Sequence, residues 1–137
     1  MAFSDPGKGR VILDSGRGTE PGKVTLAEDC KCGDVMGYSS GWKRALATTG
    51  SVIQGRLIAL ADGNNGEEVP VSANPVVKGY SGATPGGYVY VDEGSNNGQI
   101  TQTAPSTTGD ANTIIGVALS ATEVLFFLNS RPDSTAS

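Results

Sequence analysis

The apolar residues of this chain come in short runs, and clusters of Gly, Pro, Asn, Asp and Ser separate these runs at a spacing of roughly ten residues. Short runs between turn-forming residues are typical of strands in an all-β protein. The sequence therefore predicts an all-β domain, a small β-barrel or β-sandwich built of hairpins. The expected strands lie within residues 24–27, 34–38, 42–47, 52–61, 67–72, 76–80, 88–92, 99–103, 114–119 and 124–128.

Three pairs of these strands have the sequence of a β-hairpin. A strand followed by an Asn-Asn-Gly turn occurs at 55–66 and again 32 residues later at 87–98. Asn and Gly tolerate the positive φ angles of a tight turn, so both units are expected to form hairpins. A third hairpin is expected to join 114–119 to 124–128. Its strands are almost continuously apolar, which predicts burial of one face by the core and of the other by a further subunit.

The N-terminal residues 1–22 differ from the rest of the chain. They are rich in Gly and Pro and carry one apolar run, Val11, Ile12 and Leu13, directly after Arg10. A segment with so many flexible residues is not expected to fold alone. We interpret 1–22 as an extended, flexible arm, and we expect its apolar triplet to pair with an exposed sheet edge of this protein or of another.

Residues 23–129 are expected to form the β domain, and the polar residues 130–137 are expected to form a flexible C-terminal tail. Within the domain, Tyr88 and Tyr90 alternate with two valines. Because side chains alternate along a strand, the valines are expected to enter the core and the tyrosines to face outward. Aromatic side chains are enriched at interfaces, so the tyrosines either contact a neighbouring molecule or belong to an ordinary half-exposed strand.

Composition narrows the classes of function. The 137 residues include 20 Gly and 7 Pro, and no apolar window approaches the ~18 residues of a membrane span. The chain begins with neither a basic nor an apolar leader region, so we expect synthesis in a cytoplasm and no contact with a membrane. It contains no His, the commonest general base, and its net charge of −4 has the wrong sign for wrapping nucleic acid. We therefore expect no enzymatic activity, no cofactor and no nucleic-acid partner.

Three short motifs have alternative chemical interpretations. The string from Gly37 to Gly41 matches G-x-S-x-G, but a nucleophile elbow also needs a histidine base and α/β alternation, so we interpret the match as accidental. Cys30 and Cys32 supply fewer ligands than the four of a structural zinc site. Two free thiols are the expected state, and an intermolecular metal site is the alternative. Residues 62–68 lack the spacing of a calcium loop and are interpreted as a turn.

Several segments occur in a characteristic order: Gly-Asp-Val-Met-Gly-Tyr at 33–38, the strand and Asp-Gly at 55–63, Val-Val-Lys-Gly at 76–79, Gly-Gly-Tyr-Val-Tyr at 86–90, and Ile-Gly-Val-Ala-Leu-Ser-Ala at 115–121 before a last apolar strand. This order resembles that of the head decoration (capsid cement) proteins of tailed bacteriophages, over residues 24–129. Members of that family are small β-rich domains, commonly trimeric. They sit on the outer capsid at local three-fold positions and brace the major capsid protein against the pressure of packaged DNA.

The resemblance implies a structural virion protein without catalysis, which is made in the host cytoplasm, binds the major capsid protein on the outer capsid surface and associates as a homotrimer. This chain departs from the commonest pattern of the family in its longer Gly-rich arm and in its Cys-Lys-Cys triplet. The alternative is a glycan-binding or tail-appendage module of a phage or bacterium, for which one Trp and four Tyr supply few stacking rings. The residues expected to contact the capsid or a further subunit are Arg10, Val11, Ile12, Leu13, Tyr88 and Tyr90.

Overall fold

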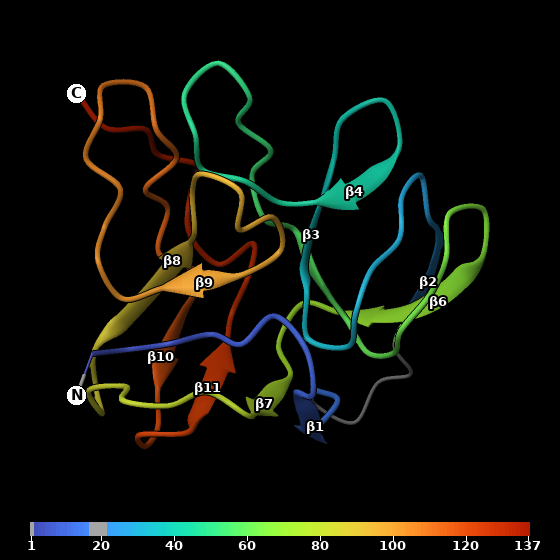
Figure 1. Ribbon diagram of the computed structural model, residues 1–137, viewed down its shortest axis with the longest axis horizontal. Coiled ribbons are helices and arrows are strands. Elements are labelled where there is room, and N and C mark those ends of the chain that lie inside the picture. The colour runs from blue at the N-terminus through green and yellow to red at the C-terminus, as the bar shows by residue number, and fades with distance from the viewer. Residues whose placement is uncertain (1, 17–21) are drawn as a thin grey trace.

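The computed structural model describes residues 2–16 and 22–137, and within those ranges its regular structure consists of short strands (Figure 1). Each of the expected apolar runs contains or overlaps a strand, and the N-terminal triplet adds another. The described ranges contain no helix that could cross a membrane. The strands are β1 (Val11–Asp14), β2 (Gly22–Thr25), β3 (Val35–Tyr38), β4 (Trp42–Arg44), β5 (Leu57–Ala59), β6 (Glu68–Ser72), β7 (Val76–Lys78), β8 (Tyr88–Val91), β9 (Ile100–Thr101), β10 (Gly116–Ala118) and β11 (Glu123–Phe126).

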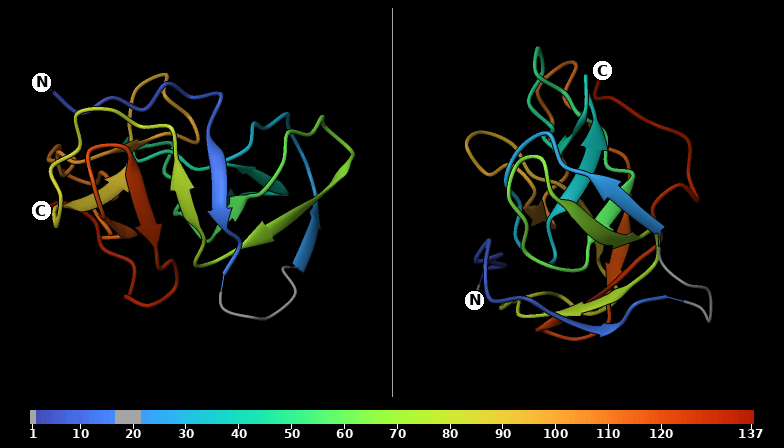
Figure 2. Two further views of the ribbon diagram at one scale, coloured as in Figure 1. Left: turned by 90° about the horizontal axis from the view of Figure 1, so that it is seen from below. Right: turned by 90° about the vertical axis from the view of Figure 1, so that its right-hand side faces the viewer.

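The strands form two antiparallel sheets. The six-stranded sheet has the order β1-β7-β11-β10-β8-β9, and the five-stranded sheet has the order β2-β6-β5-β3-β4. Figure 2 shows the two sheets as separate layers of one molecule. The all-β prediction is confirmed. Of the two architectures that the sequence left open, the sandwich fits, because the sheets do not close into a barrel.

The main core lies between the sheets because side chains alternate along each strand. Val35 and Ile58 enter it from the five-stranded sheet, and Val77, Val124 and Phe126 enter it from the six-stranded sheet. All five side chains are fully buried. A second, smaller cluster packs on the other side of the five-stranded sheet, where Leu26, Cys30, Met36, Ala59, Val69 and Val71 meet.

All three expected hairpins are confirmed. β5 pairs with β6 across the first Asn-Asn-Gly turn, and β8 pairs with β9 across the second. β10 pairs with β11, and Val117 lies opposite Leu125. The alternation expected around Tyr88 and Tyr90 is also confirmed, since Val89 and Val91 are buried while the tyrosines are not. The positive φ of Gly66 (91°) and Gly98 (79°) shows why glycine ends both Asn-Asn-Gly turns.

The N-terminal segment, which the sequence predicts to be a flexible arm, contacts the six-stranded sheet in its described part. Residues 2–16 lie along the six-stranded sheet before and within β1 (Figure 1). The ring of Phe3 stacks on Tyr80 with centroids 5.9 Å apart, and Ser4 exchanges backbone hydrogen bonds with Ser81. Residues 17–21 of the expected arm lie outside the described residues. Within the described part, long-range contacts hold the segment against the sheet, and Gly7 and Gly9 lie at a bend between these contacts.

The C-terminal residues, which the sequence predicts to be a flexible tail, also contact the body of the protein. The Arg56 guanidinium donates two hydrogen bonds of 2.6 Å to the Asp133 carboxylate. The backbone of Ala136 both accepts from Gly109 N–H and donates to the Asp110 carbonyl. The tail therefore returns along the body of the protein, where sequence composition alone predicted a flexible end.

Candidate interaction surfaces

β1 is an edge strand, and it presents apolar side chains to solvent. Val11 lies opposite Lys78 and Ile12 opposite Val77, so the triplet pairs with β7 of its own chain. Of the two sheet edges that the sequence left open, the structure uses this protein's own. Ile12 packs against the core, whereas Val11 and Leu13 are 54% and 50% exposed. An exposed apolar edge strand is a surface on which a second chain can pair.

Arg10, which the sequence placed among the contact residues, lies in the interior. The residue is 3% exposed, and its guanidinium contacts the carboxylates of Asp5 and Asp34. The reason is strand alternation: when Val11 and Leu13 face outward, Arg10 and Ile12 face inward. We call Asp5, Arg10 and Asp34 the buried ion cluster.

The buried ion cluster joins three distant parts of the chain. Asp5 also accepts hydrogen bonds from the backbone N–H groups of Gly7 and Ile100, at 2.9 Å each. Asp34 accepts one from Lys31 N–H. Burial raises the pKa of both carboxyl groups, against the opposing attraction of Arg10. The pKa values rise because burial removes the solvation of both carboxylates, which share a single guanidinium.

Two polar atoms beside the cluster have no hydrogen-bond partner within the described residues, the Arg10 Nε and the Tyr80 hydroxyl. Burial also raises the pKa of Tyr80, and the nearby Asp5 carboxylate adds to the effect. Tyr80 therefore stays neutral. The cluster ties the N-terminal segment to the body of the protein, and its three charged side chains are buried.

The outer face of the six-stranded sheet, the side turned away from the core, is largely apolar. Along one line of this face, Val76 on β7, Leu125 on β11, Val117 on β10 and Tyr88 on β8 lie opposite one another in register. Tyr88 is exposed, and the three aliphatic side chains are half-buried. Four adjacent strands thus present a continuous apolar line.

A second line on the same face contains both apolar and charged residues. Val11 lies opposite Lys78, and Lys78 lies opposite Glu123. Leu119 donates its backbone N–H to the Glu123 carbonyl at 2.8 Å, which continues the line onto the end of β10. Leu119 is 48% exposed. Apolar side chains therefore lie at both ends of this line, and opposite charges lie at its centre.

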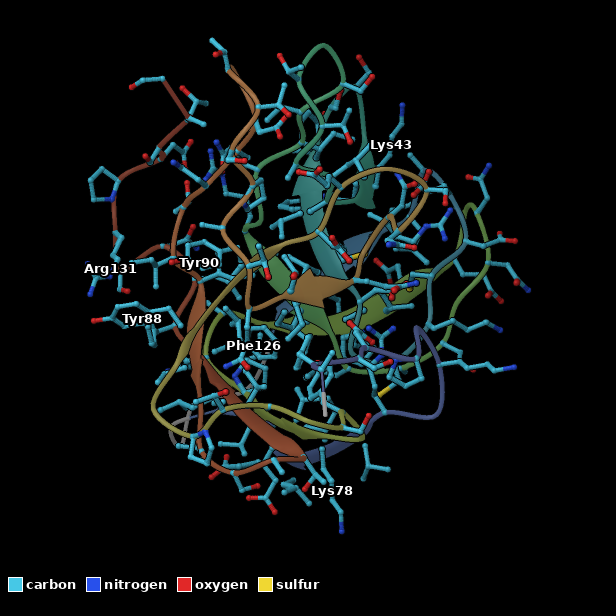
Figure 3. All side chains as sticks on the ribbon, turned by 60° about the vertical axis from the view of Figure 1, so that its left-hand side comes forward. Lys43, Lys78, Tyr88, Tyr90, Phe126 and Arg131 are labelled. Carbon is cyan, nitrogen blue, oxygen red and sulfur yellow. The ribbon has the colours of Figure 1, made fainter. Side chains whose placement is uncertain are left out.

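The β8 end of the outer face carries an aromatic group with a cation. The Arg131 guanidinium lies over the Tyr88 ring, 5.5 Å from its centroid. Tyr88, Tyr90 and Arg131 lie on one side of the molecule in Figure 3, while Phe126 points into the core. Of the predicted contact residues, the structure thus brings Val11, Leu13, Tyr88 and Tyr90 to one face and turns Arg10 and Ile12 inward.

A hollow of about 280 Å³ opens on the outer face beside β1. Val76, Leu125 and Phe127 line it with apolar atoms, and Asp14 and Asn74 line it with polar ones. Pockets lined mainly by apolar side chains with a few polar groups are the usual form of a protein binding site. The hollow can accept an apolar side chain from a second molecule.

Sequence reasoning missed one aromatic pair. Tyr38 and Trp42 face each other across the β3–β4 hairpin with centroids 5.5 Å apart and planes at 81°. Tyr38 has the largest exposed fraction among the exposed large hydrophobic side chains, 65%. The only signal was that the chain's single Trp follows Tyr38 by four residues, a spacing that a three-residue turn converts into a cross-strand pair. Ser39, Ser40 and Gly41 occupy that turn.

Cys30 and Cys32 are both free thiols, as expected. Their Sγ atoms lie 3.7 and 3.6 Å from the carbonyl oxygens of Ala61 and Leu60. Burial raises the pKa of Cys30 to about 11 and also raises the pKa of Cys32. Within the part of the chain that the structure describes, no group of three metal-ligating residues lies together. The raised pKa values make both thiols weakly reactive, and Cys30 packs in the second, smaller cluster. The intermolecular metal site stays a prediction.

Comparison of this chain with family models, with curated proteins and with solved structures found no match. The candidates for a functional site are therefore the surfaces described above. Three of them can meet a partner: the apolar outer face of the six-stranded sheet, its hollow beside β1, and the Tyr38–Trp42 pair.

Proposed function

We propose that this protein is a structural virion protein that binds the outer surface of a tailed-phage capsid and stabilises it without catalysis. The observation that carries the proposal is the apolar outer face of the six-stranded sheet, with Val11, Leu13, Tyr88 and Leu119 all exposed. Soluble monomers rarely expose large continuous apolar patches, and such patches mark contacts with other proteins. The order of sequence segments supplies the identity of the partner, the major capsid protein.

Association of several copies would give capsid binding its strength. The resemblance implies a homotrimer on the local three-fold positions of the capsid. Each copy would contribute one modest contact, and joining three contacts on one particle can raise the overall affinity by roughly 10² to 10⁴. Stabilisation of this kind needs no catalytic site. It needs a rigid domain whose surface binds several capsid subunits at once.

We place the capsid contact at the β8 end of the outer face. Tyr88 is exposed there, and Arg131 lies over its ring. Tyr and Arg are among the residues that contribute most to binding when an interface covers them. Tyr90 lies on the same strand face and widens the contact.

The test is co-sedimentation of the purified protein with expanded phage heads. Tyr88→Ala should weaken head binding at least about tenfold, which corresponds to 1.4 kcal/mol. Tyr38→Ala is the matched control, because it removes an exposed tyrosine from the other sheet and should leave head binding unchanged. Failure of the unmodified protein to sediment with heads, or an equal effect of the two variants, would contradict the proposal.

Absence of catalysis is tested separately with a serine-directed fluorophosphonate probe. The probe reacts with an activated serine nucleophile. The candidates are Ser39 and Ser40, the serines of the G-x-S-x-G string. Both serines lie in the β3–β4 turn, where Ser39 N–H donates to the Gly41 carbonyl at 2.9 Å. We expect no labelling, and stoichiometric labelling of either serine would refute this part of the proposal.

The second candidate function is glycan binding, and the Tyr38–Trp42 pair favours it. Sugar rings stack on exposed aromatic faces, and Tyr38 is 65% exposed beside Trp42. Screening against a glycan array separates the two functions. Binding that Trp42→Ala abolishes and Tyr88→Ala leaves intact would favour the glycan module over the capsid protein.

A further inference from the structure

The line of residues from Val11 to Leu119 on the outer face is complementary to itself. Its order across four strands is apolar, cationic, anionic, apolar: Val11 on β1, Lys78 on β7, Glu123 on β11 and Leu119 at the end of β10. When the same line of a second copy lies against the first in the opposite direction, apolar residues meet apolar residues and each charge meets the opposite charge. Like charges meet nowhere along the reversed line.

The geometry points to a second copy of this chain as the occupant of the outer face, related by a two-fold axis that runs along the strands between β7 and β11. A two-fold contact uses the same patch on both copies, so each contact between two residues occurs twice. Val11 then faces Leu119 of the second copy, and Lys78 faces its Glu123. This contact covers the part of the outer face from β1 to β10, whereas the proposed capsid contact lies at the β8 end, so it does not depend on the proposed capsid binding.

The line beside the charged one fits the same axis at its two central strands. At the rim of the patch, the exposed Asp14 on β1 lies opposite Val76 and would face Val117 of the second copy. Val76 on β7 and Leu125 on β11 flank the axis. Val76 of one copy therefore faces Leu125 of the other copy, and this contact occurs twice. The hollow of about 280 Å³ at these two residues provides space for the partner's apolar side chains. Two sheets that pack face to face keep their strands within about 30° of each other, which preserves the pairing of the lines near the axis.

The size of the patch sets the strength of the contact. Strands lie about 4.8 Å apart, so the distance from β1 to β10 across the patch is about 14 Å. Such a patch buries less than the ~800 Å² per partner of a standard interface. We therefore expect a reversible dimer that forms as the protein concentration rises from the micromolar to the millimolar range. This dimer contact is distinct from the trimer contact implied by the resemblance, which joins two different patches.

Sedimentation velocity over that concentration range tests the contact. The unmodified protein should gain a species of twice the mass of the smallest unit. Lys78→Glu and Glu123→Lys should each weaken self-association about tenfold or more, because each places like charges together at both contact points. Leu119→Ser should weaken it also, and Tyr38→Ser, which removes an exposed apolar side chain of the other sheet, is the matched control.

Mixing the two single charge variants is the decisive measurement. In a mixed pair, each carboxylate of the K78E copy faces a cation of the E123K copy at both contact points. The mixture should therefore associate about as strongly as the unmodified protein, although each variant alone does not. General damage to folding cannot produce this rescue. Failure of the mixture to associate, or self-association of the unmodified protein that neither variant weakens, would overturn the inference. A mass that stays at that of the smallest unit throughout the concentration range would also overturn it.

Discussion

Removing the guanidinium of the buried ion cluster should destabilise the protein strongly at neutral pH. Arg10→Met keeps a long apolar stem and deletes the charge between Asp5 and Asp34. The side chains of Arg10 and Asp5 are 0% and 1% exposed, and that of Asp34 is 4% exposed. Leaving a buried charge without its partner costs about 3–5 kcal/mol. For a domain of this size that loss lowers the melting temperature by about 10–20 °C.

The loss should shrink as the pH falls, and the sign follows from the carboxyl groups. Burial already raises the pKa of Asp5 and Asp34 above the ordinary value of 3.8, and loss of Arg10 removes the attraction that opposes this rise. A carboxyl whose pKa is higher in the folded than in the unfolded chain binds protons preferentially when folded. Such a carboxyl therefore stabilises the folded state most when the pH is near or below 3.8. This contribution is lost as the pH rises through the folded pKa.

Urea unfolding of both proteins at pH 7 and at about pH 5 supplies the measurement. The difference between Arg10→Met and the unmodified protein should be largest at pH 7. The hydrogen bond from Arg56 lowers the pKa of Asp133, so protonation of Asp133 in acid destabilises both proteins. This effect cancels when the free energies of unfolding of the two proteins are subtracted. A loss below about 1 kcal/mol at pH 7, or a loss that does not change with pH, would refute the role given to this cluster.

Three further outcomes follow from packing. Gly37→Ala would place a Cβ atom in steric overlap with the backbone carbonyl oxygen of Gln54, and thermal unfolding should show that the free energy of unfolding falls by about 1–3 kcal/mol. Ile12→Ala should cost about 1–2 kcal/mol in urea unfolding because Ile12 packs against the core, while exposed Leu13→Ala should cost less than about 0.5 kcal/mol. A thiol reagent should modify Cys32 before the buried Cys30 in the folded protein, and faster modification of Cys30 would contradict the assigned burial.

The strands and hairpins could be predicted because their signals are local. Alternating Tyr and Val in β8 and the Asn-Asn-Gly turns act over a few residues, and the structure places the expected hairpins there. Pairing between distant segments has no such signal. β1 and β7 are more than 60 residues apart in the sequence, and a slip of one residue in their register would turn Arg10 outward and Val11 inward. The interior position of Arg10 could therefore not be read from its neighbours.

The candidate surfaces also differ in whether local sequence predicts them. The outward orientation of Tyr88 and Tyr90 follows from alternation within one strand, so the sequence sufficed. The line from Val11 through Lys78 and Glu123 joins three strands that are not all consecutive, and only the order of strands in the sheet brings these residues together. Self-complementarity of charge is a property of that order, and no sequence window contains it.

The N-terminal segment shows why glycine content alone is a poor measure of flexibility. Gly7 and Gly9 have φ angles of 73° and 68°, in the left-handed region that other residues rarely adopt. The turn at Gly7 lets its N–H donate to Asp5, and that carboxylate then reaches Arg10. Glycine here fixes a bend that completes the buried ion cluster. Release of this segment to pair with a capsid would therefore leave Asp34 without its partner, so we expect the segment to remain part of the fold when the protein binds.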